Sequence, residues 1–205
     1  MIKPKEKRER YLGERLNLKG ERCASPKCAL VRKPYRPGAH GQSRKRRSVS
    51  EFGRQVMEKQ KFKLTYGLKE KNLRRLFKAA EKSTGSTTAK LLELMERRLD
   101  NVIFRLGFAP SRATARQLVV HGHVFLNGRR VRSPGLGVKA GDVISFRPES
   151  NKTRTVSELK DSLKKYEPPS WLGLDKEKLE GRVLSEPQEL TPAFEVNLLV
   201  ESFSR

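Results

Sequence analysis

The segment 111–131, SRATARQLVVHGHVFLNGRRV, contains four arginines, and their spacing suits the binding of anions. Arg112 and Arg116 lie four residues apart, so a helix would place them on one face. Arg129 and Arg130 follow together near the end of the segment. A guanidinium group stays charged and can donate paired hydrogen bonds to phosphate oxygens. This pattern therefore predicts recognition of a polyanion, and the alternative is a basic face that only water contacts.

Two elements, a helix and a hairpin, must position these arginines. Ser111 after Pro110 is a good helix N-cap because its hydroxyl can accept from an unpaired backbone N–H. Gly122 is a natural left-handed helix end. The strand that starts at Val124 then leads into Asn127-Gly128, a pair that favours the positive φ angles of a two-residue hairpin turn. The helix and the hairpin can therefore present their cations together.

The composition also favours a polyanionic partner. In 205 residues, 46 Lys and Arg outnumber 23 Asp and Glu, which gives a formal net charge of +23. Such an excess of positive charge repels itself in a compact monomer and favours binding to a polyanion such as nucleic acid. An anionic membrane is the alternative partner, but the sequence has no apolar run of roughly 18 to 20 residues, the length that a membrane-spanning helix needs. Its basic segments also lack the bulky apolar face of an interfacial helix.

The ends of the chain differ in charge. Residues 1–50 hold 16 basic and 4 acidic groups, whereas residues 167–205 hold 4 basic and 8 acidic groups. We expect the acidic end to fold back on basic elements or to face a protein partner. The first 20 residues lack the apolar stretch of a secretory signal, and two cysteines are too few for a disulfide scaffold. We therefore expect a reducing, cytoplasmic setting.

The chain pattern predicts a basic arm, a helical region, a mixed helix-and-sheet module and a tail. Residues 1–47 hold several prolines and the run RKRR at 44–47, so we expect an extended arm that orders on a partner. Ser48 and Glu51 are spaced as a capping box. Apolar stripes at helical spacing then predict three core-facing helices, with the residues Phe52, Val56, Phe62 and Tyr66; Leu73, Leu76, Phe77 and Ala80; and Leu91, Leu92, Met95, Leu99, Val102, Ile103 and Leu106.

Further elements are predicted beyond the hairpin. Residues 143–146 are a short strand, and Thr155 with Glu158 opens a capped helix. Residues 182–184 are strand-like, and Leu198, Leu199 and Phe203 indicate a short terminal helix.

The cysteines and histidines leave alternatives open. Cys23 and Cys28 are half of a tetrahedral zinc set, and even with His40 a fourth ligand would have to come from Glu14 or Glu21. We favour two free thiols, with no metal and no cofactor. His121 and His123 suit either local hydrogen bonds or contacts with phosphate or ribose. Tyr35 could stack on a base or pack on its neighbouring prolines.

The sequence predicts no enzyme. It lacks a G-x-S-x-G elbow, a Walker loop and a Rossmann glycine pattern. Three histidines and two cysteines leave few nucleophile–base pairs. Asp100 follows Arg97 and Arg98 and is expected to pair with an arginine.

Residues 96–146, through ERRLDNVIFRLGFAPSRATARQLVVHGHVFLNGRRV and KAGDVISF, resemble the RNA-binding domain named after small-ribosomal-subunit protein number four. The motifs CASPKCA, RKPYRPGAHG, EKQKFKLTYGLKEKNLRRLF and VESFSR resemble the bacterial-type family of that ribosomal protein itself. The resemblance covers nearly the whole chain from about Leu16. An organellar member of the family stays an alternative to a bacterial one.

The resemblance implies an α+β fold: a discontinuous helical domain, an inserted module of helices on a small antiparallel sheet, and the basic arm. The implied boundaries are an arm over 1–47, a helical domain over 48–95 that the tail 185–205 completes, and an RNA-binding domain over 96–184. The core module of that domain is residues 96–150. Many family members complete a zinc knot with an upstream cysteine pair, but residues 1–20 contain no cysteine. We therefore expect RNA rather than metal to organise the arm.

The resemblance also implies a function without chemistry. Family members bind small-subunit ribosomal RNA at a junction of helices in its 5′ domain and nucleate assembly. They contact ribosomal protein number five at an interface linked to decoding accuracy and lie near the entry path of messenger RNA, a further candidate partner; no membrane is implied. The residues expected to bind RNA are Arg22, Lys27, Arg32, Lys33, Tyr35, Arg36, His40, Gly41, Arg44, Lys45, Arg46, Arg47, Lys59, Gln60, Lys61, Tyr66, Arg112, Arg116, Gln117, His121, His123, Asn127, Arg129 and Arg130.

Two other functions use the same module. An RNA-modifying enzyme, such as some uridine isomerases, would need a separate catalytic domain, and nothing outside 96–150 looks suitable. A chaperone of duplex RNA on stalled subunits would be found apart from mature small subunits.

Overall fold

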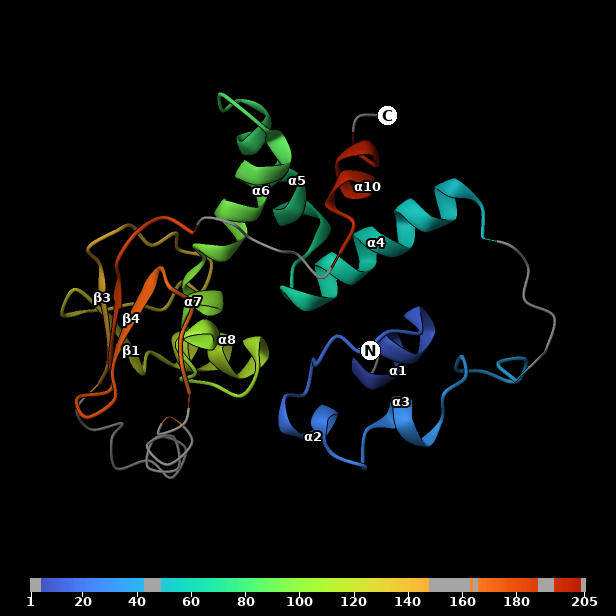
Figure 1. Cartoon of the computed structure of the whole chain (residues 1–205), viewed down its shortest axis with the longest axis horizontal. Helices are drawn as coiled ribbons and strands as arrows, with labels where there is room; N and C mark the ends of the chain where they lie inside the picture. The colour runs from blue at the N-terminus through green and yellow to red at the C-terminus, as the bar shows by residue number, and fades with distance from the viewer. Residues whose placement is uncertain (1–4, 43–48, 148–162, 164–165, 188–193, 204–205) are drawn as a thin grey trace. The chain divides into compact units, whose positions relative to one another are not determined.

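The computed structural model describes residues 5–42, 49–147, 163, 166–187 and 194–203. The backbone divides into two compact units (Figure 1). Unit 1 comprises residues 1–88 and 192–205, and unit 2 comprises residues 89–191. The chain leaves the first unit, builds the second and returns, and its helices and antiparallel sheet make an α+β fold as predicted.

Unit 1 is helical in the residues that the structure describes. Its elements are α1 (Lys5–Leu12), α2 (Glu21–Ala24), α3 (Ala29–Arg32), α4 (Glu51–Thr65), α5 (Glu70–Glu81), the start of α6 (Thr87–Glu96) and α10 (Val196–Glu201).

The basic arm contains more helix than its composition predicts. We expected extended backbone over 1–47, but α1, α2 and α3 occupy much of 5–32. A buried carboxylate accounts for part of this order. Glu9 is 1% exposed, and its Oε1 accepts from the backbone N–H groups of Leu16 (3.2 Å) and Leu18 (3.1 Å). These bonds attach the loop that follows α1 to the helix. Composition alone does not reveal such bonds.

The start of α4 also differs from its prediction. Ser48 lies outside the described residues, and the observed cap is Ser50, whose Oγ accepts from the backbone N–H of Gly53 at 3.2 Å. Phe52 and Val56 were predicted to face the core but are exposed, Phe52 by 65%. The side of α4 that is buried instead carries polar residues such as Gln55. The apolar stripe therefore marks the core only in the second half of this helix.

The tail packs on the helices of unit 1. Phe194 meets Phe62 edge-on, with ring centroids 5.8 Å apart, and Phe203 stacks on Phe77 at 4.8 Å. The predicted terminal helix is confirmed as α10 and lies beside α4. Aromatic pairs at this spacing contribute beyond the area they bury, so the last residues of the chain are part of the core of unit 1.

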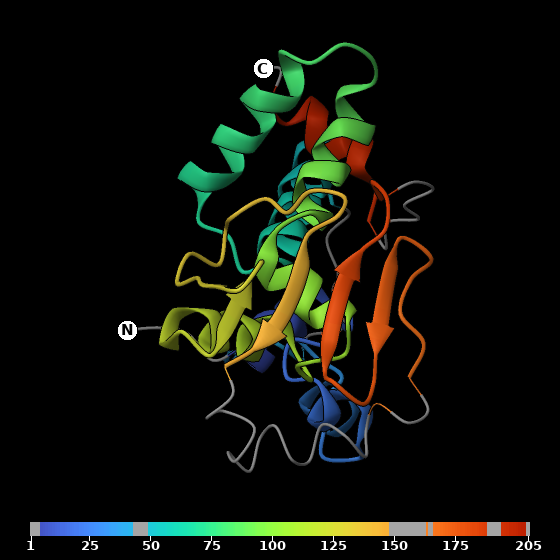
Figure 2. The same cartoon turned by 90° about the vertical axis from the view of Figure 1, so that its left-hand side faces the viewer.

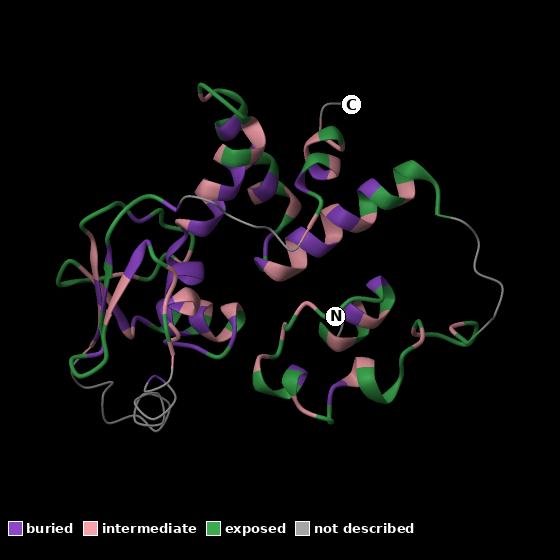
Figure 3. Cartoon of the chain, viewed as in Figure 1, coloured by how far each residue is buried: buried purple, intermediate pink, exposed green. Residues whose placement is uncertain are grey.

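Unit 2 is an antiparallel sheet with helices on one face (Figure 2). The helices are α7 (Leu99–Arg105) and α8 (Arg112–His121), and the strands are β1 (Val124–Leu126), β2 (Arg129–Arg130), β3 (Val143–Phe146), β4 (Leu172–Asp175) and β5 (Glu180–Val183). The strand order is β2-β1-β3-β5-β4. Side chains alternate between faces, so in β3 Ile144 and Phe146 are buried while Val143 and Ser145 lie on the other face. Figure 3 shows this burial along α7, α8 and the sheet.

The sequence predicted the strands over 143–146 and 182–184. The first is confirmed at both ends as β3, and the second is confirmed as β5, which starts two residues earlier and ends one residue earlier than predicted. β4 was not predicted, because the glycine within Leu172–Asp175 weakens its strand pattern. The helix predicted to open at Thr155 lies outside the described residues.

The predicted single helix over 91–106 is two helices, α6 and α7, with a break at Arg97 and Arg98. Arg98 is extended (φ −67°, ψ 135°) and forms an antiparallel bridge with Gly137. The backbone N–H groups of Leu99 and Asp100 donate to carbonyls of the loop before β3 instead of to α6. The apolar spacing is continuous through the break, so periodicity alone could not reveal it.

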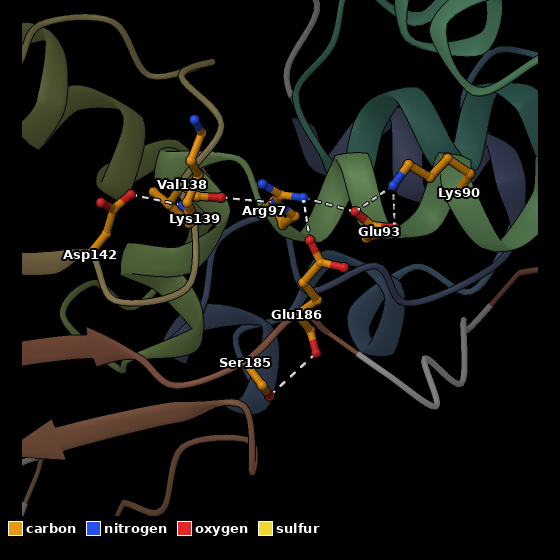
Figure 4. A network of polar contacts seen from close by, with 8 residues as sticks. All are labelled: Lys90, Glu93, Arg97, Val138, Lys139, Asp142, Ser185 and Glu186. Atoms are coloured by element: carbon orange, nitrogen blue, oxygen red, sulfur yellow. Dashed lines mark hydrogen bonds and ion pairs between the residues drawn. The ribbon is translucent and has the colours of Figure 1, made fainter. Parts of the chain in front are cut away.

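A polar network fixes the break (Figure 4). Arg97 Nε donates to the carbonyl of Val138 at 2.8 Å, and Arg97 Nη1 donates to Glu93 Oε1 at 2.9 Å and to Glu186 Oε1 at 3.1 Å. Lys90 binds the same Glu93 carboxylate. Burial alone would raise the pKa of Glu93, but the hydrogen bonds from Lys90 and Arg97 outweigh it and lower the pKa.

Candidate nucleic-acid interface

The helix and hairpin of the module form as the sequence predicts. Ser111 Oγ accepts from the backbone N–H of Thr114 at 3.2 Å, and Gly122 ends α8 with φ 73°. Asn127 and Gly128 have φ of 50° and 75° and connect β1 to β2. These three predictions are confirmed.

Two arginines of α8 are held by buried polar groups of α7. Arg112 Nε donates to Asn101 Oδ1 at 2.7 Å, and its guanidinium lies 4.5 Å from the Phe104 ring centroid. Arg116 Nη1 lies 3.7 Å from Asp100 Oδ2. Both side chains are half-buried rather than extended into water. Their guanidinium groups are therefore oriented before any partner binds.

The α7 anchors are themselves fully bonded. Asp100 is 3% exposed and accepts a paired bond from Arg98, at 3.0 and 2.7 Å, which confirms the predicted pairing with an arginine. Asn101 is 0% exposed and donates to Glu96, whose carboxylate also binds Arg105. Buried charges that are paired and hydrogen-bonded in this way resist rearrangement.

Arg130 closes the end of α8. Its Nε donates to the carbonyl of Gly122 at 3.1 Å, and its Nη2 donates to the carbonyl of His121 at 3.3 Å. A Cβ at Gly122 would lie 2.4 Å from Arg130 Nε, so this contact needs glycine. A cation at a helix C-terminus also interacts favourably with the helix dipole.

The remaining module positions lie on α8, at its C-terminal end and in the hairpin. Gln117, His121 and Arg129 are exposed, while His123 is half-buried with its ring centroid 6.2 Å from that of His121. Asn127 closes the hairpin onto β3: its amide donates to Asp142 and its Oδ1 accepts from the backbone N–H of Val143, both at 2.8 Å. We define the module surface as Arg112, Arg116, Gln117, His121, His123, Arg129 and Arg130.

The predicted arm residues are mostly exposed. We define the arm surface as Arg22, Lys27, Arg32, Lys33, Arg36 and His40, all of which are exposed. Arg22 forms an ion pair with Glu6 at 2.9 Å. Tyr35 is half-buried under the guanidinium of Arg10, 4.9 Å from the ring centroid. The positions Arg44, Lys45, Arg46 and Arg47 lie outside the described residues.

Gly41 has a structural reason to be glycine. A Cβ at this position would lie 1.8 Å from the carbonyl oxygen of Arg36, so only glycine allows the backbone to approach so closely. The N–H of Gly41 donates to the carbonyl of Gly38 at 3.1 Å. This tight turn fixes the course of the backbone at Arg36.

The four predicted positions around α4 take part in the packing of unit 1. Lys59 pairs with Glu70 at 3.0 Å and lies over the Phe203 ring, and Tyr66 is 6% exposed. Gln60 is half-buried. Because these side chains are paired or at least half-buried within the protein, we include them in neither the module surface nor the arm surface.

Lys61 is 7% exposed, and its ammonium binds the carboxylates of Glu14 and Glu58. Burial alone would lower the pKa of Lys61, but these hydrogen bonds outweigh it and raise the pKa. The lysine is therefore charged at neutral pH and bound within the protein.

Cys23 and Cys28 are buried, free thiols. Cys23 Sγ accepts from the backbone N–H of Lys19 at 3.4 Å, and burial raises the pKa of this thiol. Among the described residues, no group of three His, Cys, Asp or Glu side chains could hold a metal ion. No described helix has the length and apolar character needed to span a bilayer.

Sequence reasoning missed two groups that shape the arm. Arg10 Nε donates to the carbonyls of Lys33 (3.0 Å) and Tyr35 (3.1 Å), and Tyr11 beside it is 57% exposed. An aromatic residue in the helix KEKRERYL, in which only Leu12 is otherwise uncharged, is the signal that could have drawn attention to this position.

Unit 2 carries a cationic helix and hairpin against an antiparallel sheet, and comparison with known proteins identifies this part of the chain as an RNA-binding domain. Residues 97–144 match the family model of the S4 domain, and residues 1–96 match that of the ribosomal protein S4/S9 N-terminal domain. A protein of Syntrophomonas wolfei named small ribosomal subunit protein uS4 is 47% identical over 195 residues, which cover 94% of this chain and 93% of that protein. The protein of the same name from Gloeobacter violaceus is 46% identical, covering 96% and 94%.

The chain therefore belongs to the ribosomal protein S4 family. Members of this family are structural proteins and not enzymes, so the prediction of a protein without catalytic chemistry is confirmed.

Proposed function

We propose that this protein, a structural constituent of the small ribosomal subunit, binds small-subunit ribosomal RNA directly at a junction of helices in the 5′ domain and helps to nucleate assembly there. The observation that carries the proposal is the module surface, where Arg112 and Arg116 are oriented by the buried Asn101 and Asp100. Relatives named small ribosomal subunit protein uS4 support the assignment to that particle.

The mechanism is electrostatic. Folded RNA offers few readable base edges in its deep major groove, so shape and phosphate positions determine recognition. Oriented guanidinium groups can bridge phosphates of converging strands with paired hydrogen bonds. The exposed cations of the arm surface add phosphate contacts. Neutralising strands that repel one another then favours the closed junction.

Equilibrium binding to transcripts of the 5′ domain tests this proposal. The full chain should bind an intact multihelix junction about 10³-fold more tightly than a transcript of the same length with scrambled helices. Equal affinity for the two transcripts would contradict the proposal, since it would leave only general attraction between opposite charges.

The proposal extends to ribosomal protein number five and to decoding accuracy, in the cytoplasm, with messenger RNA at the entry path as a further contact. Support for a protein partner comes from the exposed apolar side chains of Val49 and Phe52 in unit 1 and from the acidic balance of residues 167–205. Phe52→Ser should weaken binding of the purified chain to protein number five and leave RNA binding unchanged. Unaltered binding of that protein would exclude this face.

A further inference from the structure

An aromatic side chain lies unusually open on the arm. Tyr11 in α1 is 57% exposed, although the neighbouring Glu9 and Leu12 are buried and anchor the helix. The guanidinium of Arg36 lies 5.5 Å from the centroid of the Tyr11 ring. Such a cation stabilises the electron-rich face of an aromatic ring. Tyr11 therefore combines an open ring with a bound cation.

The pair is held in place by its neighbours. Arg10 Nε donates to the carbonyls of Lys33 and Tyr35, which fastens the 33–36 loop to α1. The guanidinium of Arg10 covers the Tyr35 ring at 4.9 Å. The two cation–aromatic pairs thus alternate between the helix and the loop. Together with the close approach of Gly41 to the Arg36 carbonyl, they fix Arg36 beside Tyr11.

The surroundings suit a nucleotide better than an apolar partner. Lys7, one helical turn before Tyr11, is exposed. Arg15, which follows the end of α1, is exposed as well. Apart from Tyr11 and Leu12, every residue of α1 is charged. An apolar protein surface would bury these charges unpaired, whereas an RNA strand can place its phosphates on them.

We propose that Tyr11 and Arg36 form a stacking platform for one unpaired nucleobase of RNA, with the exposed Lys7 close to the adjoining phosphates. Every base has a flat face that stacks on an aromatic ring or a guanidinium plane, so the platform needs no particular base. The assignment differs from the expectation for Tyr35, whose ring Arg10 already covers. It rests on the proposed RNA binding of the arm.

Binding of the full chain to the intact 5′-domain transcript tests the platform. Tyr11→Ala should weaken binding about 10-fold, while Tyr11→Phe, which keeps the ring, should bind within about 2-fold of the unmodified protein. Val31→Ala is the matched control, because Val31 is an apolar side chain in α3 with 54% exposure. The unfolding midpoint of all three variants should stay close to that of the unmodified protein.

Salt dependence separates stacking from charge. Tyr11→Ala should leave the slope of log affinity against log salt unchanged, because losing a stacked ring changes no phosphate contact. If the unmodified protein fails to bind the transcript, the proposed function is wrong. If it binds and Tyr11→Ala binds equally well, the platform is wrong. A loss in Tyr11→Phe as large as that in Tyr11→Ala would also overturn the platform, since the hydroxyl would then carry the effect.

Discussion

The module surface and the arm surface are both cationic, but the protein holds their charges differently. In the module, Arg112 and Arg130 have hydrogen-bond partners in the protein, the amide of Asn101 and the carbonyl of Gly122. In the arm, Arg32 and Lys33 are exposed at the end of a four-residue helix. A side chain that is already oriented loses less entropy on binding. We infer that the module sets the geometry of RNA binding and that the exposed arm cations such as Arg32 and Lys33 mainly add charge.

The largest effect is expected from removing Asp100, the buried carboxylate that binds Arg98 and lies beside Arg116. Asp100→Ala should lower the free energy of unfolding by about 3 to 5 kcal/mol, because it leaves the 5% exposed Arg98 without its paired acceptor. Chemical denaturation measures this loss. Glu177→Ala, a change at an exposed residue of unit 2, is the control and should cost less than about 0.5 kcal/mol. A loss below that level for Asp100→Ala would show that the buried pair does not stabilise the module.

The next test removes the oriented arginines. Arg112→Ala with Arg116→Ala should weaken binding to the junction by about 10- to 100-fold. It should also cost about 1 kcal/mol of stability, because the buried Asn101 loses its donor. Helicity measured by circular dichroism should be retained. Loss of helicity would show that the arginines serve the fold rather than RNA.

A smaller effect is expected from the arm. Arg32→Ala with Lys33→Ala should reduce the slope of log affinity against log salt by about 2 and leave stability within about 0.5 kcal/mol. If this double variant of the arm reduces the preference for the intact junction as much as Arg112→Ala with Arg116→Ala does, the proposed division of roles between the two surfaces is wrong.

The smallest effect concerns pH and the network around the break between α6 and α7. The pKa of Glu93 is lowered in the folded protein, so its stabilising contribution is present above its ordinary value of 4.5 and is lost as the pH falls through the lowered pKa. Glu93→Gln should therefore cost on the order of 0.5 kcal/mol at neutral pH and less at pH 3. Denaturation at the two pH values measures the difference. An equal cost at both would contradict an ionic role.

Local chemistry made the module predictable. The caps at Ser111 and Gly122 and the turn at Asn127 depend on neighbouring residues only, and all three are found as expected. The division between α6 and α7 depends on the bridge from Arg98 to Gly137, nearly 40 positions away, and no local pattern encodes such a contact.

The site residues show the same limit. The sequence shows which side chains are cationic, but it does not show which of them are exposed. It could not separate Lys61, which binds two carboxylates inside unit 1, from exposed cations such as Lys27. Likewise, the motif around Tyr35 pointed to a ring that the Arg10 guanidinium covers, while the exposed ring belongs to Tyr11. Exposure is decided by tertiary packing, which the spacing of residues does not report.

The most direct test of the account is the salt dependence of binding between the full chain and the intact junction. If about eight phosphates are engaged, log affinity should fall with log salt at a slope of about −6, and the module pair Arg112→Ala with Arg116→Ala should reduce that slope by about 2. A slope near zero would contradict the account, because it would mean that the cationic surfaces do not contact the RNA backbone.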